Sequence, residues 1–216
     1  MQTDNLIHHR KSGKWSHKQG AFSSMAGSEP GGSAFPEHDG SKMGAIMFDI
    51  NFCRQQPISR WFQMLVRRDP SVAEHTLRVT GLSFLMAQKT GFTEQQLFDL
   101  QIGTLLHDIG KLAIPSAIMA KPGKLTLSER QIVRQHPVFG HEWLLTLKDS
   151  ESFRTIPLFH HERWDGTGYP YGLSRIQIPL TARIVSLADV WDAITSDRPY
   201  RGAMSLDQAI ALIEAE

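Results

Sequence analysis

The stretch TEQQLFDLQIGTLLHDIGKLAIP, residues 93–115, decides how the chain folds. Thr93 starts an S/T-x-x-E/Q capping box, which marks the beginning of a helix. Leucines follow at helical spacing, at positions 97, 100, 105 and 106. Pro115 bars the helix from extending much further. The pattern therefore predicts an apolar helix whose last turn carries the adjacent side chains of His107 and Asp108.

Helical patterns continue on both sides of this stretch. Upstream, one pattern runs over residues 57–68, and the next carries His75 on its apolar stripe and ends at Gly91. Downstream, a capping box at Thr126 opens a helix that should end at His136, before a proline. Further helices are expected over residues 138–147 and 152–161, after Pro179, and from Ser205 onward. Because no segment is rich in strand patterns, we predict an all-α fold.

Composition excludes several classes of protein. The 23 basic and 22 acidic side chains give a formal net charge of +1, so we expect no nucleic-acid polymer as a partner. The single cysteine, Cys53, excludes an internal disulfide framework and a thiolate zinc cluster. Neither a membrane-spanning run nor the apolar core of a secretion signal is visible. We therefore expect a soluble, cytoplasmic protein with no membrane partner.

The N-terminal region differs in composition from the rest. Residues 1–44 are rich in Ser, Gly, Pro, Lys and His and show neither helical nor strand periodicity. A segment of this kind lacks the apolar surface needed to order itself, so we expect a disordered tail. A helical lead-in over residues 45–70 and a single domain over residues 71–216 should follow.

Histidines and aspartates at several helix ends indicate a metal site. His107 and Asp108 together would also fit a hydrogen-bonded structural pair, because a buried carboxylate needs either a partner or a cation. His160 and His161 are more informative, since they bring two nitrogen donors to one point between an apolar helix and the glycine-rich loop 162–178. Imidazole and carboxylate ligands together suit iron or manganese, with zinc as an alternative. The candidate metal ligands are His75, His107, Asp108, His136, His160, His161 and Asp189.

Four stretches in this order resemble an HD-GYP domain. They are HDIGK at 107–111, KPGKL from Lys121, HHERWDGTGYPYGL at 160–173 and IPLTARIVSLADVWDAITSDRPYR at 178–201. The resemblance covers about residues 71–216, and the long loop signature makes it specific. It implies an HD-domain helical bundle with a Gly/Pro-rich GYP loop.

The resemblance implies a role for each matching residue. Asp108 stands in the place of the carboxylate that bridges two metals. The other six candidate ligands also match metal ligands of the family: His75, His107, His136, His160, His161 and Asp189. Lys111 joins His107 and Asp108 in the implied catalytic set. The implied substrate contacts are Lys111, Tyr169, Arg198 and Arg201.

The function implied by the resemblance is hydrolysis of cyclic di-GMP, a bacterial second messenger. Two divalent metal ions, Fe or Mn with Zn as the alternative, would support cleavage of its phosphodiester bonds to pGpG, to GMP or to both. Diguanylate cyclases or other signalling proteins are expected partners through the GYP loop.

Two positions depart from the family pattern. Ser71 stands four residues before His75, where the family often has a carboxylate that helps to hold a third metal. A serine hydroxyl is a poorer ligand, so two metals are expected rather than three. Arg201 replaces the usual lysine, which keeps the charge and changes the contact geometry.

Two other functions remain open at the level of sequence. One is that of another HD-superfamily nucleotide phosphohydrolase, which would use a single metal. The other is that of a catalytically degenerate domain that binds cyclic di-GMP or a protein partner. The chain stops at Glu216 inside a predicted helix, whereas the family fold usually continues, so we expect a C-terminally truncated domain.

Overall fold

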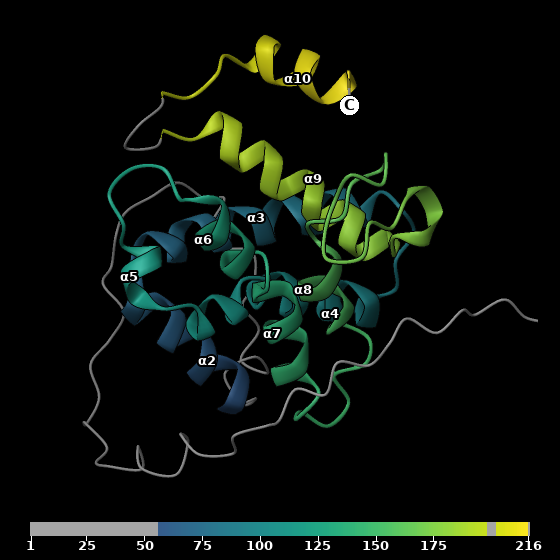
Figure 1. Cartoon of the computed structure of the whole chain (residues 1–216). Helices are drawn as coiled ribbons and strands as arrows, with labels where there is room; N and C mark the ends of the chain where they lie inside the picture. Colours follow the sequence, from purple (N-terminus) through teal and green to yellow (C-terminus); the bar gives the residue numbers. More distant parts are fainter. Residues whose placement is uncertain (1–55, 198–201, 216) are drawn as a thin grey trace, which may run out of the picture. The chain divides into compact units, whose positions relative to one another are not determined.

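The computed structural model describes residues 56–197 and 202–215 of the chain (Figure 1). Within these ranges every regular element is helical, which confirms the predicted all-α class. None of the described helices has the length and apolar character needed to cross a membrane. The predicted tail, Arg198 and Arg201 lie outside the described residues.

The α-helices were largely predicted from capping and periodicity. They are α2 (Gln56–Arg68), α3 (Ser71–Gln88), α4 (Glu94–Leu105), α5 (Ser116–Met119), α6 (Leu127–Val133), α7 (His136–Leu144), α8 (Thr155–Phe159), α9 (Leu180–Thr195) and α10 (Leu206–Glu214). Two 3-10 helices, η1 (Ile109–Ala113) and η2 (Arg175–Gln177), lie between them. The two predicted capping boxes form, at Thr93 and Thr126, and a third caps the helix expected from Ser205.

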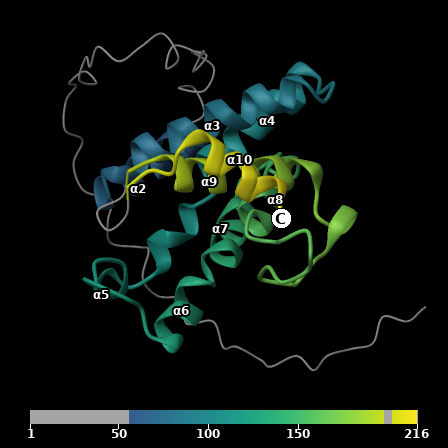
Figure 2. The same cartoon turned by 90° about the horizontal axis from the view of Figure 1, so that it is seen from above.

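Helix α4 contributes to two apolar clusters, as expected for the stretch that decides the fold. One cluster joins α4 to α2, η1 and α7 through Ile58, Ile102, Leu105, Leu106, Ile109, Leu144 and Phe153. The other joins α4 to α3, α8 and α9 through Val79, Ala87, Leu100, Ile156, Ile184, Val185 and Ala188. Helix α9 packs on α3, and α10 lies along α9 (Figure 2). The segment that follows α4 and carries His107 and Asp108 is therefore held in place by buried neighbours on both sides, Leu106 and Ile109.

The end of α4 differs from the sequence prediction. The α-helix stops at Leu105, so His107 and Asp108 lie in the turn before η1 rather than in the last helical turn. In η1, Gly110 packs directly on the backbone of α7, where a Cβ atom would collide with the carbonyl of His136. This close approach is a tertiary contact, which a helical pattern in the sequence does not reveal.

His136 also lies at a different place in its element. It was predicted to end a helix, but α6 stops at Val133 and His136 begins α7, with Pro137 in the first turn. Proline suits that position because it lacks the N–H that would have no helical partner there and its φ already fits a helix. Both His136 and Gly110 thus lie at the contact between η1 and α7.

Candidate metal centre

The packing of α3, α4, α7 and α8 brings six of the seven predicted ligands together. Asp108 belongs to two groups, in each of which the possible ligand atoms lie within 4.8 Å of one another. The first group contains Asp108, His136, His160 and His161, and the second contains His75, His107 and Asp108. The side chains come from α3, from the ends of α4 and α8, and from the start of α7. Asp108 is therefore the one residue shared by both groups among the described residues.

The three buried histidines are held in one ring orientation. Each ring donates its Nδ1–H to a backbone carbonyl three residues earlier in the chain: His107 to Thr104 (2.6 Å), His136 to Val133 (2.7 Å) and His160 to Pro157 (2.8 Å). A carbonyl oxygen can only accept, so each Nδ1 carries a proton, and Nε2 is the nitrogen that faces the centre. Fixing the far nitrogen in this way is what proteins do with metal-binding histidines.

The atoms that face inward lack hydrogen-bond partners. Within the described part of the chain, the Nε2 atoms of His107, His136 and His160 and the Oδ1 atom of Asp108 are buried and unpaired. His136 Nε2 and His160 Nε2 lie 3.3 and 3.9 Å from Asp108 Oδ1. Unpaired buried polar atoms are costly, and several that converge on one point fit a bound cation. The residues present therefore suit divalent metal ions.

The electrostatics of the centre also favour the ligand forms of Asp108, His160 and His161. Burial alone would raise the pKa of Asp108, but the charges of Lys111 and His107 hold it well below its ordinary value. Burial lowers the pKa of His160, with His161 adding to the effect. Burial and the neighbouring His136 lower the pKa of His161 to about 3. Asp108 is therefore ionised, and His160 and His161 are neutral, near pH 7.

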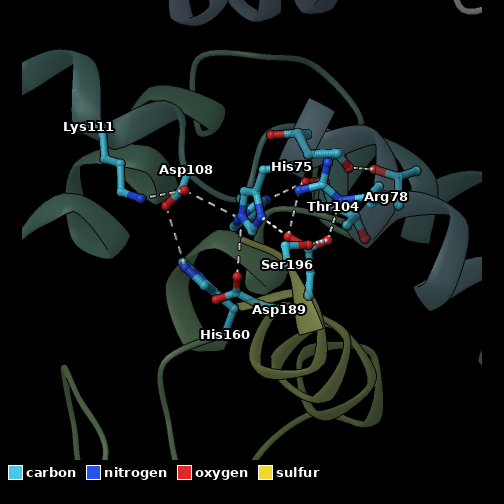
Figure 3. Close-up of polar contacts among 12 residues, drawn as sticks. His75, Arg78, Thr104, Asp108, Lys111, His160, Asp189 and Ser196 are labelled. Atoms are coloured by element: carbon cyan, nitrogen blue, oxygen red, sulfur yellow. Dashed lines mark hydrogen bonds and ion pairs between the residues drawn. The ribbon is translucent and has the colours of Figure 1, made fainter. Parts of the chain in front are cut away.

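Lys111, predicted to face substrate phosphate, contacts the shared carboxylate. Its Nζ lies 2.5 Å from Asp108 Oδ2, and about a quarter of the side chain is exposed. Lys111 and His160 approach Asp108 from different directions (Figure 3). The lysine thus borders the centre and also reaches its solvent side.

His75 is oriented by two aspartates of α9. Its Nε2 lies 3.3 Å from Asp189 Oδ1 (Figure 3). Its Nδ1 bonds Asp192 Oδ2 at 2.7 Å. Asp192 is almost fully buried and also accepts hydrogen bonds from Arg78 and Ser196. Sequence reasoning identified Asp189 and missed Asp192. Its position three residues after Asp189 on the same helix was the available signal.

The GYP loop is held by a second residue that the sequence analysis missed. Glu162 is buried, and its carboxylate accepts backbone N–H groups of Tyr171 at 2.7 Å and Leu173 at 2.9 Å. Gly168 lies so close to the backbone of Glu162 that a Cβ atom would collide with it. Glu162 therefore folds the loop back over the end of α8. A carboxylate directly before a glycine-rich loop was the signal for this role.

The folded loop places Tyr169 on the candidate ligand His161. The two rings stack with centroids 4.8 Å apart and an angle of 26° between their planes. The guanidinium carbon of Arg134 lies 4.9 Å from the centroid of the tyrosine ring, within range of a cation–π contact. Tyr169 thus lies against the candidate ligand His161, and Arg134 adds an exposed cation beside it.

Comparison with known proteins identifies the family. The family model described as HD domain matches residues 61–216. The chain belongs to the HD domain family. A solved structure described as Bd1817, a HDG"Y"P protein from Bdellovibrio bacteriovorus, aligns with a TM-score of 0.53 at 26% identity, covering 65% of this chain and 45% of that chain. These findings confirm the family resemblance seen in the four quoted stretches.

Curated relatives carry informative names. The cyclic di-GMP phosphodiesterase response regulator RpfG of Xanthomonas campestris is 38% identical over 80% of this chain and 46% of its own length. A cyclic di-GMP phosphodiesterase of Thermotoga maritima is 42% identical over 68% of this chain and 41% of its own. A 3'3'-cGAMP-specific phosphodiesterase of Vibrio cholerae is 38% identical over 68% of this chain and 32% of its own length. The chain thus spans less than half the length of these relatives.

Proposed function

We propose that this HD domain is a metal-dependent phosphodiesterase that hydrolyses cyclic di-GMP to pGpG, to GMP or to both. The observation that carries the proposal is the shared position of Asp108 in two groups of ligand atoms. A single carboxylate between two groups is the arrangement needed to bridge two cations, and paired cations are typical of enzymes that cleave phosphate esters. A mononuclear nucleotidase would not need both groups.

Two divalent ions would be held by the seven predicted ligands. The first group offers His136, His160 and His161 with one oxygen of Asp108, and the second offers His75 and His107 with Asp108. Asp189 adjoins the second group through His75. Imidazole and carboxylate together suit Fe(II) or Mn(II), with Zn(II) as the alternative. Bound there, such ions supply Lewis-acid activation of water and neutralise charge on the scissile phosphate.

The surrounding side chains would bind and orient the substrate. Lys111 presents an ammonium group beside Asp108, where it can compensate negative charge that develops on a phosphate. Tyr169 covers one side of His161 and keeps water from that face of the centre. Arg198 and Arg201 lie outside the described residues, and their roles in phosphate binding rest on the sequence resemblance.

The substrate proposal is supported by the names of the relatives. Both the Xanthomonas campestris and the Thermotoga maritima relatives are named for cyclic di-GMP. Because other relatives are named for 3'3'-cGAMP, which differs in one base, this dinucleotide is the most informative competing substrate. A bacterial second messenger as substrate would place the domain in the cytoplasm.

The outer surface of the GYP loop would serve protein partners such as a diguanylate cyclase. Trp164, Tyr171 and Ile176 are large apolar side chains there, and they are 50%, 61% and 83% exposed. Exposed apolar side chains that cluster on one segment are typical of interaction sites. The same loop folds over the metal centre, so a partner bound to it would also contact the substrate side.

Hydrolysis assays with defined metals test the proposed function. Full-length protein purified without oxygen and loaded with Fe(II) or Mn(II) should convert cyclic di-GMP to pGpG or GMP faster than it converts 3'3'-cGAMP. Asp108→Asn provides the matched inactive variant, because it keeps the side-chain shape and removes the bridging charge. Binding of cyclic di-GMP without turnover in either metal would instead assign the domain as a receptor.

A further inference from the structure

A cavity of about 310 Å³ lies beside Lys111, between the α2–α3 turn and α5. Its walls are mainly apolar, formed by Leu65, Val72, Met119 and Ala120. Its polar groups include Asp69, Ser116 and two cationic side chains, Arg68 and Lys111. A mainly apolar cavity with a few polar groups is the usual form of a small-molecule site, and about 300 Å³ is the lower end of the size range.

Lys111 connects this cavity to the metal centre. Its side chain lines the cavity, and its Nζ contacts Asp108 Oδ2 at 2.5 Å. A substrate with its scissile phosphate beside Lys111 would therefore have its neighbouring nucleoside within reach of the cavity. The volume is too small for a whole cyclic dinucleotide and suits one base.

Arg68 fixes the wall of the cavity that carries Lys111. Its guanidinium donates hydrogen bonds to the carbonyl oxygens of Lys111 at 3.0 Å and Leu112 at 2.7 Å, and also to that of Ile114. These bonds tie η1 to the end of α2. The guanidinium is used on the protein's own backbone, so the cavity is preformed and Arg68 acts as part of its wall.

Asp69 is the carboxylate of the cavity, and its orientation is set by Ser71. The Oδ1 atom accepts hydrogen bonds from the Ser71 backbone N–H at 3.1 Å and from the Ser71 hydroxyl at 2.6 Å. The side chain is nevertheless exposed and lies outside both ligand groups of the metal centre. An oriented carboxylate accepts hydrogen bonds only, so Asp69 favours a ligand that presents hydrogen-bond donors.

We propose that this cavity is a guanine subsite, in which Asp69 accepts hydrogen bonds from N1–H and the 2-amino group of one base. Guanine presents two adjacent donors on that edge, whereas adenine presents an acceptor at N1 and has no 2-amino group. A site built around such donors discriminates strongly against a base that lacks them. This assignment rests on the proposed function and adds base selectivity to it.

Asp69→Asn tests the subsite by reversing its hydrogen bonding. An asparagine amide keeps an acceptor for Ser71 but also presents a donor, so it complements adenine better than guanine. The KM for cyclic di-GMP should rise about 10- to 100-fold, as expected for loss of charge-assisted hydrogen bonds. The KM for cyclic di-AMP should fall, and metal content should stay the same. Asp99→Asn, on a half-buried carboxylate of α4 that bonds Gln95, is the matched control.

A binding measurement separates this subsite from the proposed function. Titration calorimetry of the metal-loaded full chain with 5'-GMP and 5'-AMP needs no turnover. Wild type should bind GMP at least about tenfold more tightly, and Asp69→Asn should lose that preference. Ala120→Leu, which narrows the cavity without touching Asp69, should weaken binding of both nucleotides.

The outcomes distinguish the two proposals. A preference for GMP that depends on Asp69, in a protein that hydrolyses no cyclic dinucleotide, would retain the subsite and reject the phosphodiesterase. Hydrolysis of cyclic di-GMP with the same KM and the same base selectivity in Asp69→Asn would retain the enzyme and overturn the subsite. Equal binding of GMP and AMP by wild type would overturn it as well.

Discussion

Asp192 accepts the Nδ1–H of His75 at 2.7 Å, and this hydrogen bond turns the Nε2 atom of His75 toward Asp189. The same carboxylate is anchored by Arg78 and Ser196. Asp192 therefore stands behind the ligand group that contains His75. Carboxylates in this position fix the tautomer and the orientation of a metal-binding histidine.

Asp192→Asn should weaken metal binding at one of the two sites about 10- to 100-fold, because an amide is a poorer acceptor for His75. Equilibrium dialysis against Mn(II) would show one site of normal affinity and one that is weakened. Glu74→Gln is the control, since Glu74 also contacts Arg78, at 3.8 Å, but is highly exposed. Two sites of unchanged affinity in Asp192→Asn would count against this positioning role.

Lys111→Ala separates charge compensation at the substrate from metal binding. The kcat should fall by about 10²- to 10³-fold, as for loss of a group that stabilises transition-state charge. Bound metal should stay constant or increase, because Asp108 loses a cation that competes with metal. Lys121→Ala, which breaks an ion pair with Glu129 away from the centre, should leave kcat unaltered. Loss of metal from Lys111→Ala would show a structural role instead.

Gly110→Ala should destabilise the fold, because the added methyl group would collide with the backbone of His136. We expect a loss of about 1–3 kcal/mol or more in the free energy of unfolding, together with loss of metal. Gly81→Ala in α3 is the matched control: no atom lies within 4 Å of its added Cβ, so it should stabilise by about 0.5–1 kcal/mol. Denaturant unfolding of both variants measures the contrast, and similar midpoints would contradict it.

Metal affinity should rise with pH up to about 9. Burial opposes the charged form of His75, but its hydrogen bonds to Asp189 and Asp192 outweigh this and raise its pKa to about 9. Below that pH a proton competes with metal, so affinity should increase about tenfold per pH unit for each proton displaced. His161, with its pKa of about 3, releases no proton in this range. Mn(II) titrations between pH 6 and 9 measure the slope, and a flat profile would contradict it.

The same pKa shift has a consequence for metal-stripped protein. Because the folded-state pKa of His75 lies above its ordinary value of 6.5, the charged form adds stability that is fully present below about pH 6.5. This contribution is lost as the pH rises toward 9. Thermal unfolding after chelation should therefore show a falling midpoint over this interval, and His75→Gln should show a smaller decline.

Sequence patterns predicted the helices where the signal is local. The capping boxes at Thr93 and Thr126 mark helix starts without help from the rest of the fold, and both form. The end of α4 and the start of α7 were misplaced, because both depend on the contact of Gly110 with the backbone of His136. A close approach between distant segments leaves no periodic trace in the sequence.

The sequence motifs indicated the candidate ligands, which the fold brings close together, but they did not indicate the residues that support them. Asp192 bonds His75, which lies 117 residues away in the chain. Glu162 bonds backbone groups 9 and 11 residues away, and Arg68 bonds carbonyl groups 43 to 46 residues away. Their hydrogen bonds depend on tertiary packing, so their positions in the sequence gave little indication of function. Asp69 was missed for the same reason, because only the fold places it in a cavity with Lys111.

The most direct test of whether Asp108 joins two metal sites is the metal-to-protein ratio of the full chain. Mass spectrometry of anaerobically purified wild type and Asp108→Asn measures it. Ser71 bonds Asp69 at the start of α3, and neither residue belongs to the two ligand groups, so no third site is expected from the described residues. Wild type should hold close to two metals per chain, and Asp108→Asn should hold fewer than one. Three metals in wild type, or two in Asp108→Asn, would contradict a two-metal centre bridged by Asp108.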